Sequence, residues 1–197
     1  MKLIIGTTND GKLMELRELF SGVDVELEGL HRFPHLIEPL ENGETFEENA
    51  VIKASEYARQ TGEWALADDS GLEINALGGA PGVHSARFGG SDSTYHEKIR
   101  MILDRLEDTE DRSARFLCVI AVARPDGEIA AIATGECHGE IVREPRGPNG
   151  FGYDPIFTPD GYDRTFGEMT DDEKSLLSHR SRAAEQIIRR MLDFIGV

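Results

Sequence analysis

The stretch KLIIGTTNDGKLMELRELFSG, from Lys2 to Gly22, shows how this chain of 197 residues is built. KLII is a short apolar run of the kind that forms a buried strand, and the polar turn GTTNDG follows it. Beyond the turn, Leu13, Leu16 and Phe20 recur at helical spacing, and Gly22 marks the end of a helix. The stretch therefore predicts a strand, a turn and a helix, the unit from which α/β proteins are built.

The alternation of strands and helices continues through the first half of the chain. VDVELEG, residues 23–29, alternates like a half-buried strand. TFEENAVIKASEYARQTG, residues 45–62, predicts a helix that opens with a capping box of Thr45 and Glu48. EWALADD, residues 63–69, then predicts a strand that ends in two acids, and a glycine-rich loop follows it.

The second half of the chain predicts a hairpin between two helices. ARFLCVIAVARPDGEIAAIATGECHGEI, residues 114–141, indicates two strands around a turn at residues 125–127. The helix before it spans about residues 94–106 and opens with a second capping box, and a long helix after it spans about residues 170–194.

These elements predict a mixed α/β fold. We expect an elongated, curved sheet flanked by helices, in two lobes with a central cleft. The sequence has no internal repeat and no linker, so residues 1–197 are expected to form a single domain.

Acidic residues dominate the charged composition, with 37 Asp and Glu against 21 Lys and Arg and a net charge of -16. A field of this sign repels nucleic acid and anionic lipid, so we expect neither nucleic acid nor a membrane as a partner. No apolar segment has the length needed to cross a bilayer. The two cysteines, Cys118 and Cys137, are too few for a disulfide scaffold, which favours a reduced, cytoplasmic setting.

Two adjacent acids, Asp68 and Asp69, close the strand predicted for EWALADD. A buried carboxylate without a partner is unfavourable and two neighbouring ones repel each other, so a positive group is expected beside them. Mg²⁺ fits, because proteins usually hold it with one or two carboxylates while substrate phosphates supply further oxygens. Glu41, in an upstream loop, is another candidate ligand. The alternative for Asp69 is a cap on the turn that begins at Ser70.

The turn GTTNDGK, residues 6–12, is a candidate phosphate site. Free backbone N–H groups at a helix start bind anions, and Thr7, Thr8 and Asn9 add short polar side chains. Lys12 lies near the positive end of the helix dipole, where a cation is mildly unfavourable unless a phosphate is bound. The alternative is that Asn9 only caps the helix and Lys12 is solvated. Because the segment is not a Walker loop, the residues alone leave both interpretations open.

Two later segments also fit a nucleotide. GPNGFGYDPIF, residues 147–157, has glycines that let the backbone approach a ligand, and Phe151 and Tyr153 are placed to wall a flat ring. The alternative is a turn whose aromatic side chains close the core. EKSLLSHR, residues 173–180, concentrates positive charge in an acidic chain, as a polyphosphate requires, whereas isolated basic residues on a helix usually face solvent.

The order of these segments resembles one family. Through TTNDGK, TFEENAVIKA, ADDSGLEINALGGAPGVHSARFGG, GPNGFGYDPIF and EKSLLSHR, the chain is similar to the Ham1-like inosine triphosphate pyrophosphatases over nearly its full length. Each motif is weak alone, but five in this order are specific. The resemblance implies a homodimer that uses Mg²⁺ to convert dITP, ITP and XTP to the monophosphate and pyrophosphate. Such an enzyme removes deaminated purine nucleotides from the precursor pool.

The resemblance also implies roles for individual residues. Asp69 would be the proton acceptor and a metal ligand, with Asp68 and Glu41 as further metal ligands. The implied substrate contacts are Thr7, Thr8, Asn9, Asp10, Gly11 and Lys12 in the phosphate turn, Ser70 beside the acids, Phe151, Gly152, Tyr153 and Asp154 in the base-binding loop, and Lys174, His179 and Arg180.

The chain departs from the family in one place. Many members carry an acidic pair before a loop glycine, where this chain reads Leu40-Glu41-Asn42-Gly43, so only Glu41 remains as a candidate. Two alternative functions are a nucleotide-binding regulatory module, which would not need Asp69, and a Maf-like nucleotide pyrophosphatase. The SHR and FGYD motifs argue against the Maf-like alternative.

Overall fold

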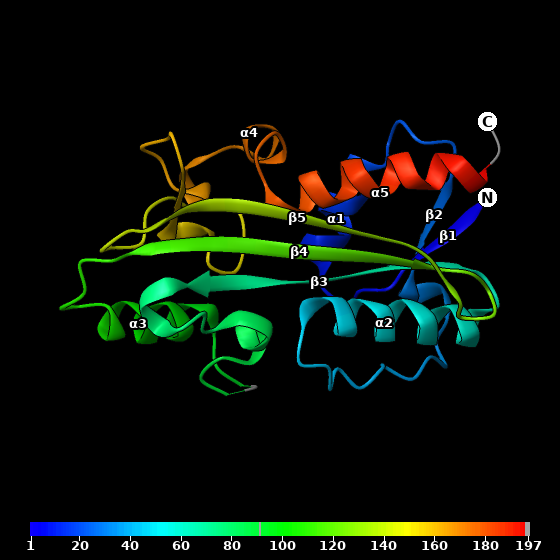
Figure 1. Ribbon diagram of the computed structural model, residues 1–197, viewed down its shortest axis with the longest axis horizontal. Helices are drawn as coiled ribbons and strands as arrows, with labels where there is room; N and C mark the ends of the chain where they lie inside the picture. The colour runs from blue at the N-terminus through cyan, green and yellow to red at the C-terminus, as the bar shows by residue number, and fades with distance from the viewer. Residues whose placement is uncertain (91, 196–197) are drawn as a thin grey trace. The chain divides into compact units, whose positions relative to one another are not determined.

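The strand, turn and helix predicted at the start of the chain are present (Figure 1). In the computed structural model, which describes residues 1–90 and 92–195, β1 (Lys2–Ile5) leads into α1 (Asp10–Leu19). Asn9 caps α1, because its side chain accepts a hydrogen bond from the backbone N–H of Lys12.

The remaining elements follow the predicted alternation. In chain order they are β2 (Glu26–Gly29), α2 (Phe46–Thr61), β3 (Trp64–Ile74), α3 (Tyr95–Arg105), β4 (Ser113–Ala123), β5 (Ile129–Ile141), β6 (Phe157–Pro159), α4 (Asp171–Ser175) and α5 (His179–Ile195). Short 3₁₀ helices lie at Leu30–Arg32, Asn75–Leu77, Gly82–Arg87, Asp154–Ile156 and Phe166–Glu168. The capping boxes predicted at the starts of α2 and α3 are both confirmed.

Six strands form one sheet in the order β2-β1-β3-β4-β5-β6. β1 runs parallel to β2 and β3, whereas β5 and β6 are antiparallel. A tight turn joins β4 to β5, in which the N–H of Gly127 donates to the carbonyl of Arg124 at 2.7 Å. Gly127 has a φ of +86°, which only glycine adopts easily. The predicted mixed α/β class, with helices around the sheet, is confirmed, and so is the turn within residues 125–127.

The residues group into two compact units, in agreement with the two lobes expected from the sequence. The first unit comprises Met1–Asp69, Cys118–Gly135 and the chain from Arg180 onward, and the second comprises Ser70–Leu117 and Glu136–His179. The expected cleft stays a prediction. So does the single domain over residues 1–197, whose last two residues lie outside the described part of the chain.

In the first unit, α2 lies on one face of the strands, and α1 and α5 lie on the other (Figure 1). Successive side chains of a strand point to opposite faces, so Leu66 packs beside α1 and α5 whereas Ala65 and Ala67 are buried on the side of α2. The core beside α1 and α5 includes Leu3, Ile5, Leu16, Phe20, Leu66, Cys118, Ile120, Val122, Ala184, Ile187 and Met191.

The second unit has its own core, which is rich in aromatic side chains. Phe116 on β4 meets Phe157 on β6 edge to face, with their ring centroids 4.7 Å apart. Other members are Leu72, Ile74, Ile99, Ile102, Tyr153 and Phe166. This core holds in place the loops that follow β5.

The strand predicted to end at Asp69 is longer than expected. β3 runs on to Ile74, and Leu72 and Ile74 are both buried while Glu73 between them is half-buried. This alternation is a strand pattern. The prediction was wrong because Ser70 and the glycine after it were interpreted as the start of a turn, although both keep the extended conformation.

The long helix predicted from Thr170 onward is two helices, α4 and α5. The capping box of Thr170 and Glu173 starts α4, but the N–H groups of Leu177 and Ser178 both donate to the carbonyl of Lys174 and tighten the chain there. Ser178 directly precedes α5, a place that serine favours. The prediction missed this second start because the pattern of helix-forming residues continues across it.

Candidate active site

The turn after β1 begins where two backbones come close together. The N–H of Gly6 donates to the carbonyl of Leu66 at 2.7 Å, and a Cβ on Gly6 would lie 2.6 Å from Cδ2 of Tyr57. Only glycine fits at this position. Oγ1 of Thr7 then accepts from the N–H of Asn9 at 3.2 Å, which fixes the start of α1. The residues of the turn that are exposed are Thr8, Asn9 and Asp10, and Gly11 is half-buried.

The sequence left two interpretations of this turn open: a phosphate site, or a helix cap at Asn9 with a solvated Lys12. The structure bears on each residue separately. Asn9 is a helix cap, since its Oδ1 accepts from the N–H of Lys12 at 3.0 Å. Lys12 is not a solvated side chain, because it is only 16% exposed and its Nζ lies 3.0 Å from Oδ2 of Asp68. An ammonium is therefore held beside the N-terminus of a helix, where both groups attract anions.

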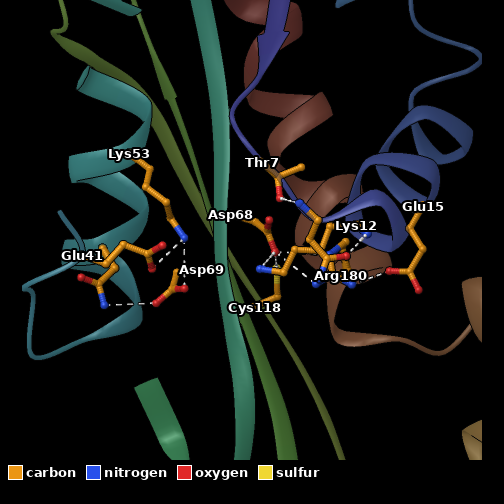
Figure 2. A network of polar contacts seen from close by, with 11 residues as sticks. Thr7, Lys12, Glu15, Glu41, Lys53, Asp68, Asp69, Cys118 and Arg180 are labelled. Carbon is orange, nitrogen blue, oxygen red and sulfur yellow. Dashed lines mark hydrogen bonds and ion pairs between the residues drawn. The ribbon is translucent and has the colours of Figure 1, made fainter. Parts of the chain in front are cut away.

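Asp68 is the centre of a buried cluster of charges (Figure 2). Its Oδ2 lies 3.0 Å from Nζ of Lys12 and 3.1 Å from Nη2 of Arg180. Arg180 also donates to Glu15, and Sγ of Cys118 lies 3.8 Å from Oδ2 of Asp68. The cluster joins α1, β3, β4 and α5.

Burial and charge act in opposite directions on this cluster. Burial favours the neutral form of Asp68, but Lys12 and Arg180 outweigh it and hold the pKa of Asp68 well below its usual range. Burial likewise opposes the charge of Arg180, while Asp68 and Glu15 raise its pKa above the ordinary value. For Cys118, burial and then Asp68 raise the pKa of the thiol. These groups therefore keep fixed charge states at neutral pH.

Asp69 points to the opposite side of β3, toward α2 (Figure 2). Nζ of Lys53 lies 3.2 Å from Oδ1 of Asp69 and 3.1 Å from Oε2 of Glu41, so two carboxylates meet at one ammonium. Nδ2 of Asn49 donates to Oδ2 of Asp69 at 3.3 Å. Asn49 and Lys53 are one turn apart on α2, which places both on the same face of that helix.

The electrostatic surroundings make Asp69 a stronger base than an ordinary aspartate. Burial raises its pKa, and the opposing effects of Lys53 and Lys12 do not cancel the rise. Burial lowers the pKa of Lys53, but Asp69, Asp68 and Glu41 outweigh it and leave the value raised. The lysine thus remains charged while Asp69 has the character of a proton acceptor.

The expectation that Asp68 and Asp69 act together at one metal ion stays a prediction, and the geometry of β3 weighs against it. Adjacent residues of a strand point to opposite faces, and β3 continues through both of them. Asp68 already lies between Lys12 and Arg180, which would repel a third positive charge. The sequence indicated a pair only because the strand was expected to end at this point.

Glu41 and Asp69 fit a divalent cation. Their carboxylates supply hard oxygen ligands, and they already converge on the positive charge of Lys53. Within residues 1–90 and 92–195, no cluster of three or more His, Cys, Asp and Glu side chains is placed to bind an ion. A metal held by Glu41 and Asp69 would therefore take its other ligands from substrate phosphates and water, as Mg²⁺ commonly does.

In the second unit, Asp154 fixes the loop that carries the FGYD motif. Its Oδ2 accepts from the N–H of Phe151 at 2.8 Å and from Nζ of Lys174 at 2.7 Å. Nζ of Lys174 also lies 4.6 Å from the centroid of the Phe151 ring, a cation–π contact. A Cβ on Gly150 would lie 2.2 Å from Oδ2 of Asp154, so this turn requires glycine. The structure thus brings three of the predicted residues together.

Tyr153 is buried in the core of the second unit, which agrees with the alternative that the aromatic side chains of this loop close the core. Its hydroxyl donates to the carbonyl of Ser85 at 2.8 Å, and its ring meets that of Tyr95 edge to face. Burial raises the pKa of Tyr153. His179 is also buried, and its ring stacks on that of Phe116 with the ring centroids 4.7 Å apart. Of the other predicted residues, Ser70 is half-buried on β3 and Gly152 has a φ of +66° in the loop.

Three polar residues of the site were missed from the sequence: Glu15, Asn49 and Lys53. Asn49 and Lys53 are both buried, and they interrupt the apolar face of α2 beside Ala50 and Ala54. Polar residues within a buried stripe are the signal that could have revealed them. Glu15 gave no such signal, because a glutamate on α1 is compatible with solvent.

Comparison with known proteins agrees with this arrangement. A profile described as the Ham1 family matches residues 3–190. A dITP/XTP pyrophosphatase of Bacillus anthracis is 44% identical over 199 residues, covering 99% of this chain and 98% of that protein. One from a Nostoc species is 47% identical over 189 residues, covering 96% and 93%.

The fold matches as well as the sequence. The structure of a HAM1 protein from Coxiella burnetii superposes with a TM-score of 0.90 at 43% sequence identity, covering 98% of this chain and 99% of that one. The resemblance inferred from five short motifs is thereby confirmed over nearly the whole length of the sequence. The chain belongs to the Ham1 family.

Proposed function

We propose that this chain is a pyrophosphatase that hydrolyses dITP, ITP and XTP to the monophosphate and pyrophosphate. The observation that carries the proposal is the convergence of Glu41 and Asp69 on one cation, Lys53. A triphosphate and its metal ion need such acids, and they also need cations such as Lys12 for the phosphate oxygens. The relatives named dITP/XTP pyrophosphatase support the choice of substrates.

The chemistry follows from the surroundings of Asp69. Its carboxylate takes a proton from the water that attacks the α-phosphorus, and its raised pKa suits this role. Lys12 neutralises charge that builds on the phosphate oxygens, with the backbone N–H groups at the start of α1. A Mg²⁺ ion held by Glu41 and Asp69 would polarise the phosphates. The bond from the α-phosphorus to the oxygen that bridges it to the β-phosphorus then breaks, so that pyrophosphate leaves and the nucleoside monophosphate remains.

The remaining contacts are proposed from the family resemblance. In the first unit they are Thr7, Thr8, Asn9, Asp10, Gly11 and Arg180, and in the second unit they are Ser70, Phe151, Gly152, Tyr153, Asp154, Lys174 and His179. The geometry refines two of these roles. Asp154 acts by holding Lys174 and the loop, and Arg180 is engaged with Asp68 and Glu15.

The main alternative is a regulatory module that binds nucleotides without chemistry. Such a module would keep the phosphate turn but would have no use for a carboxylate of raised pKa beside a lysine. A Maf-like pyrophosphatase is a second alternative within the same class of enzyme, and the match to the Ham1 family argues against it.

Steady-state hydrolysis separates these possibilities. We expect Mg²⁺-dependent release of pyrophosphate from ITP, dITP and XTP with kcat/KM values far above those for ATP and GTP. Tight binding of ITP without turnover would favour the regulatory module. Turnover of modified pyrimidine nucleotides in preference to ITP would favour the Maf-like alternative.

We also propose that the protein is a cytoplasmic homodimer that uses Mg²⁺. The support for the dimer and the metal is the family resemblance, and the support for the compartment is that both cysteines are buried thiols. Among residues 1–90 and 92–195, the structure contains no helix with the length and apolarity of a membrane span. Sedimentation equilibrium and a titration of activity with Mg²⁺, Mn²⁺ and Ca²⁺ test the dimer and the metal.

A further inference from the structure

Asn49 is a fully buried polar side chain inside α2, and it makes three hydrogen bonds. Its Oδ1 accepts from the N–H of Gly43 at 2.8 Å, and its Nδ2 approaches the carbonyl of Gly43 at 3.4 Å. The same Nδ2 donates to Oδ2 of Asp69 at 3.3 Å. Asparagine is a poor residue for a helix interior, so a reason for its presence is needed.

The two bonds to Gly43 fix which way the amide of Asn49 points. A backbone N–H can only donate and a backbone carbonyl can only accept, so Oδ1 must face the N–H and Nδ2 must face the carbonyl. The second hydrogen of Nδ2 is then directed at Asp69. Because an amide nitrogen cannot accept, this contact always supplies a donor to Oδ2 of Asp69.

We infer that Asn49 is a positioning residue for both carboxylates of the site. It holds Oδ2 of Asp69 while Lys53 holds Oδ1, so the two contacts together set the orientation of the carboxylate. It also anchors Gly43, two residues after Glu41, and thereby sets where Glu41 meets Lys53. The effects expected on the turnover of ITP rest on the proposed function, whereas those on Mg²⁺ binding and on amide exchange do not.

The close packing around Gly43 supports this role. A Cβ on Gly43 would lie 2.7 Å from Cβ of Glu48 and 2.8 Å from Oδ1 of Asn49. The loop therefore lies directly against the amide, with no room for a side chain. This gives a second way to disturb the contact, since Gly43→Ala pushes on Asn49 without changing it.

The experiment compares Asn49→Ala, Asn49→Asp and Gly43→Ala with the wild type. Asn42→Ala is the matched control, because Asn42 is an exposed asparagine of the same loop. The readouts are kcat and KM for ITP, the Mg²⁺ concentration at half-maximal rate, calorimetric binding of Mg²⁺ in the presence of pyrophosphate, and amide hydrogen exchange at Gly43. Thermal unfolding curves identify any variant that fails to fold.

We expect Asn49→Ala and Gly43→Ala to lower kcat or Mg²⁺ affinity about 10- to 100-fold, the usual effect of losing a partner of a metal ligand. KM for ITP should change far less than kcat. Asn49→Asp should do worse than Asn49→Ala, since it replaces the donor to Asp69 with a second negative charge. Exchange at Gly43 should accelerate in Asn49→Ala, which loses the acceptor of the Gly43 N–H, whereas Asn42→Ala should behave like the wild type.

Two results would overturn the inference. One is faster exchange at Gly43 with wild-type kcat and Mg²⁺ affinity, which would mean that Asn49 only ties down the loop. The other is an Asn49→Asp variant as active as the wild type. If the wild type itself does not turn over ITP, the proposed function fails. The Mg²⁺ titration and the exchange at Gly43 then decide the inference without it.

Discussion

At the scale of single residues, the neighbours Asp68 and Asp69 have opposite roles. Both are buried acids on β3, but Asp68 lies between two cations beside α1 and α5, whereas Asp69 meets Lys53 beside α2. The alternation of a strand separates them. Asp68 is thus mainly a structural counter-charge, and Asp69 is the reactive group of the proposed mechanism.

Replacing each acid with asparagine should separate the two roles. Asp69→Asn should lower turnover of ITP about 10²- to 10⁴-fold, the usual contribution of a general base. Asp68→Asn should mainly reduce stability, by about 3–5 kcal/mol, because it removes the partner of Lys12 and leaves the buried Arg180 with Glu15 alone as a counter-charge. Urea unfolding and initial rates measure both effects. Equal losses of stability in the two variants would contradict the assignment.

Lys12 should contribute to binding of the charged phosphates and not to binding of the nucleoside. Lys12→Ala is expected to weaken binding of ITP by about 1.5–3 kcal/mol, the range for a lost hydrogen bond to a charged group. Binding of inosine should hardly change, because it carries no phosphate. Calorimetric titrations with both ligands test this, and a similar loss for ITP and inosine would place Lys12 away from the phosphates.

At the scale of elements, prediction succeeded where the start of a helix has a side-chain signal. The capping boxes at Thr45 and Thr94 and the turn near Gly127 were all identified from local residues. The length of β3 and the break after α4 were not. The first depends on the place of β3 between β1 and β4 in the sheet, and the second depends on backbone hydrogen bonds to Lys174, which have no side-chain signal.

The capping box of α4 should make stability depend on acid pH. Arg164 and then the N–H of Thr170 lower the pKa of Glu173 from 4.5 to about 2. A carboxyl group whose pKa is lower in the folded than in the unfolded state stabilises the fold fully when the pH is above the unfolded pKa. This stabilisation is lost as the pH falls through the folded pKa. The gap in Tm between the wild type and Glu173→Gln should therefore be full above about pH 5 and close towards pH 2. A gap that is constant with pH would show that Glu173 acts without its charge.

At the scale of the whole molecule, the sequence motifs identified the family, and local geometry supports the proposed roles of the site residues. The residues that hold the carboxylate of Asp69, Lys53 and Asn49, come from α2, whose apolar pattern drew attention away from them. Their importance depends on contacts between segments 16 and 20 residues apart in the chain. The polar residues within the buried stripe of α2 were a signal that Asn49 and Lys53 have partners, but the spacing of a single sequence does not show that the partner is Asp69.

The central claim is that water attacks the α-phosphorus of a nucleoside triphosphate. The most direct measurement is hydrolysis of ITP with Mg²⁺ in water labelled with a heavy oxygen isotope, followed by mass spectrometry of both products. We predict that the products are IMP and pyrophosphate and that the label is in IMP. Label in pyrophosphate, or formation of IDP and free phosphate, would contradict the account.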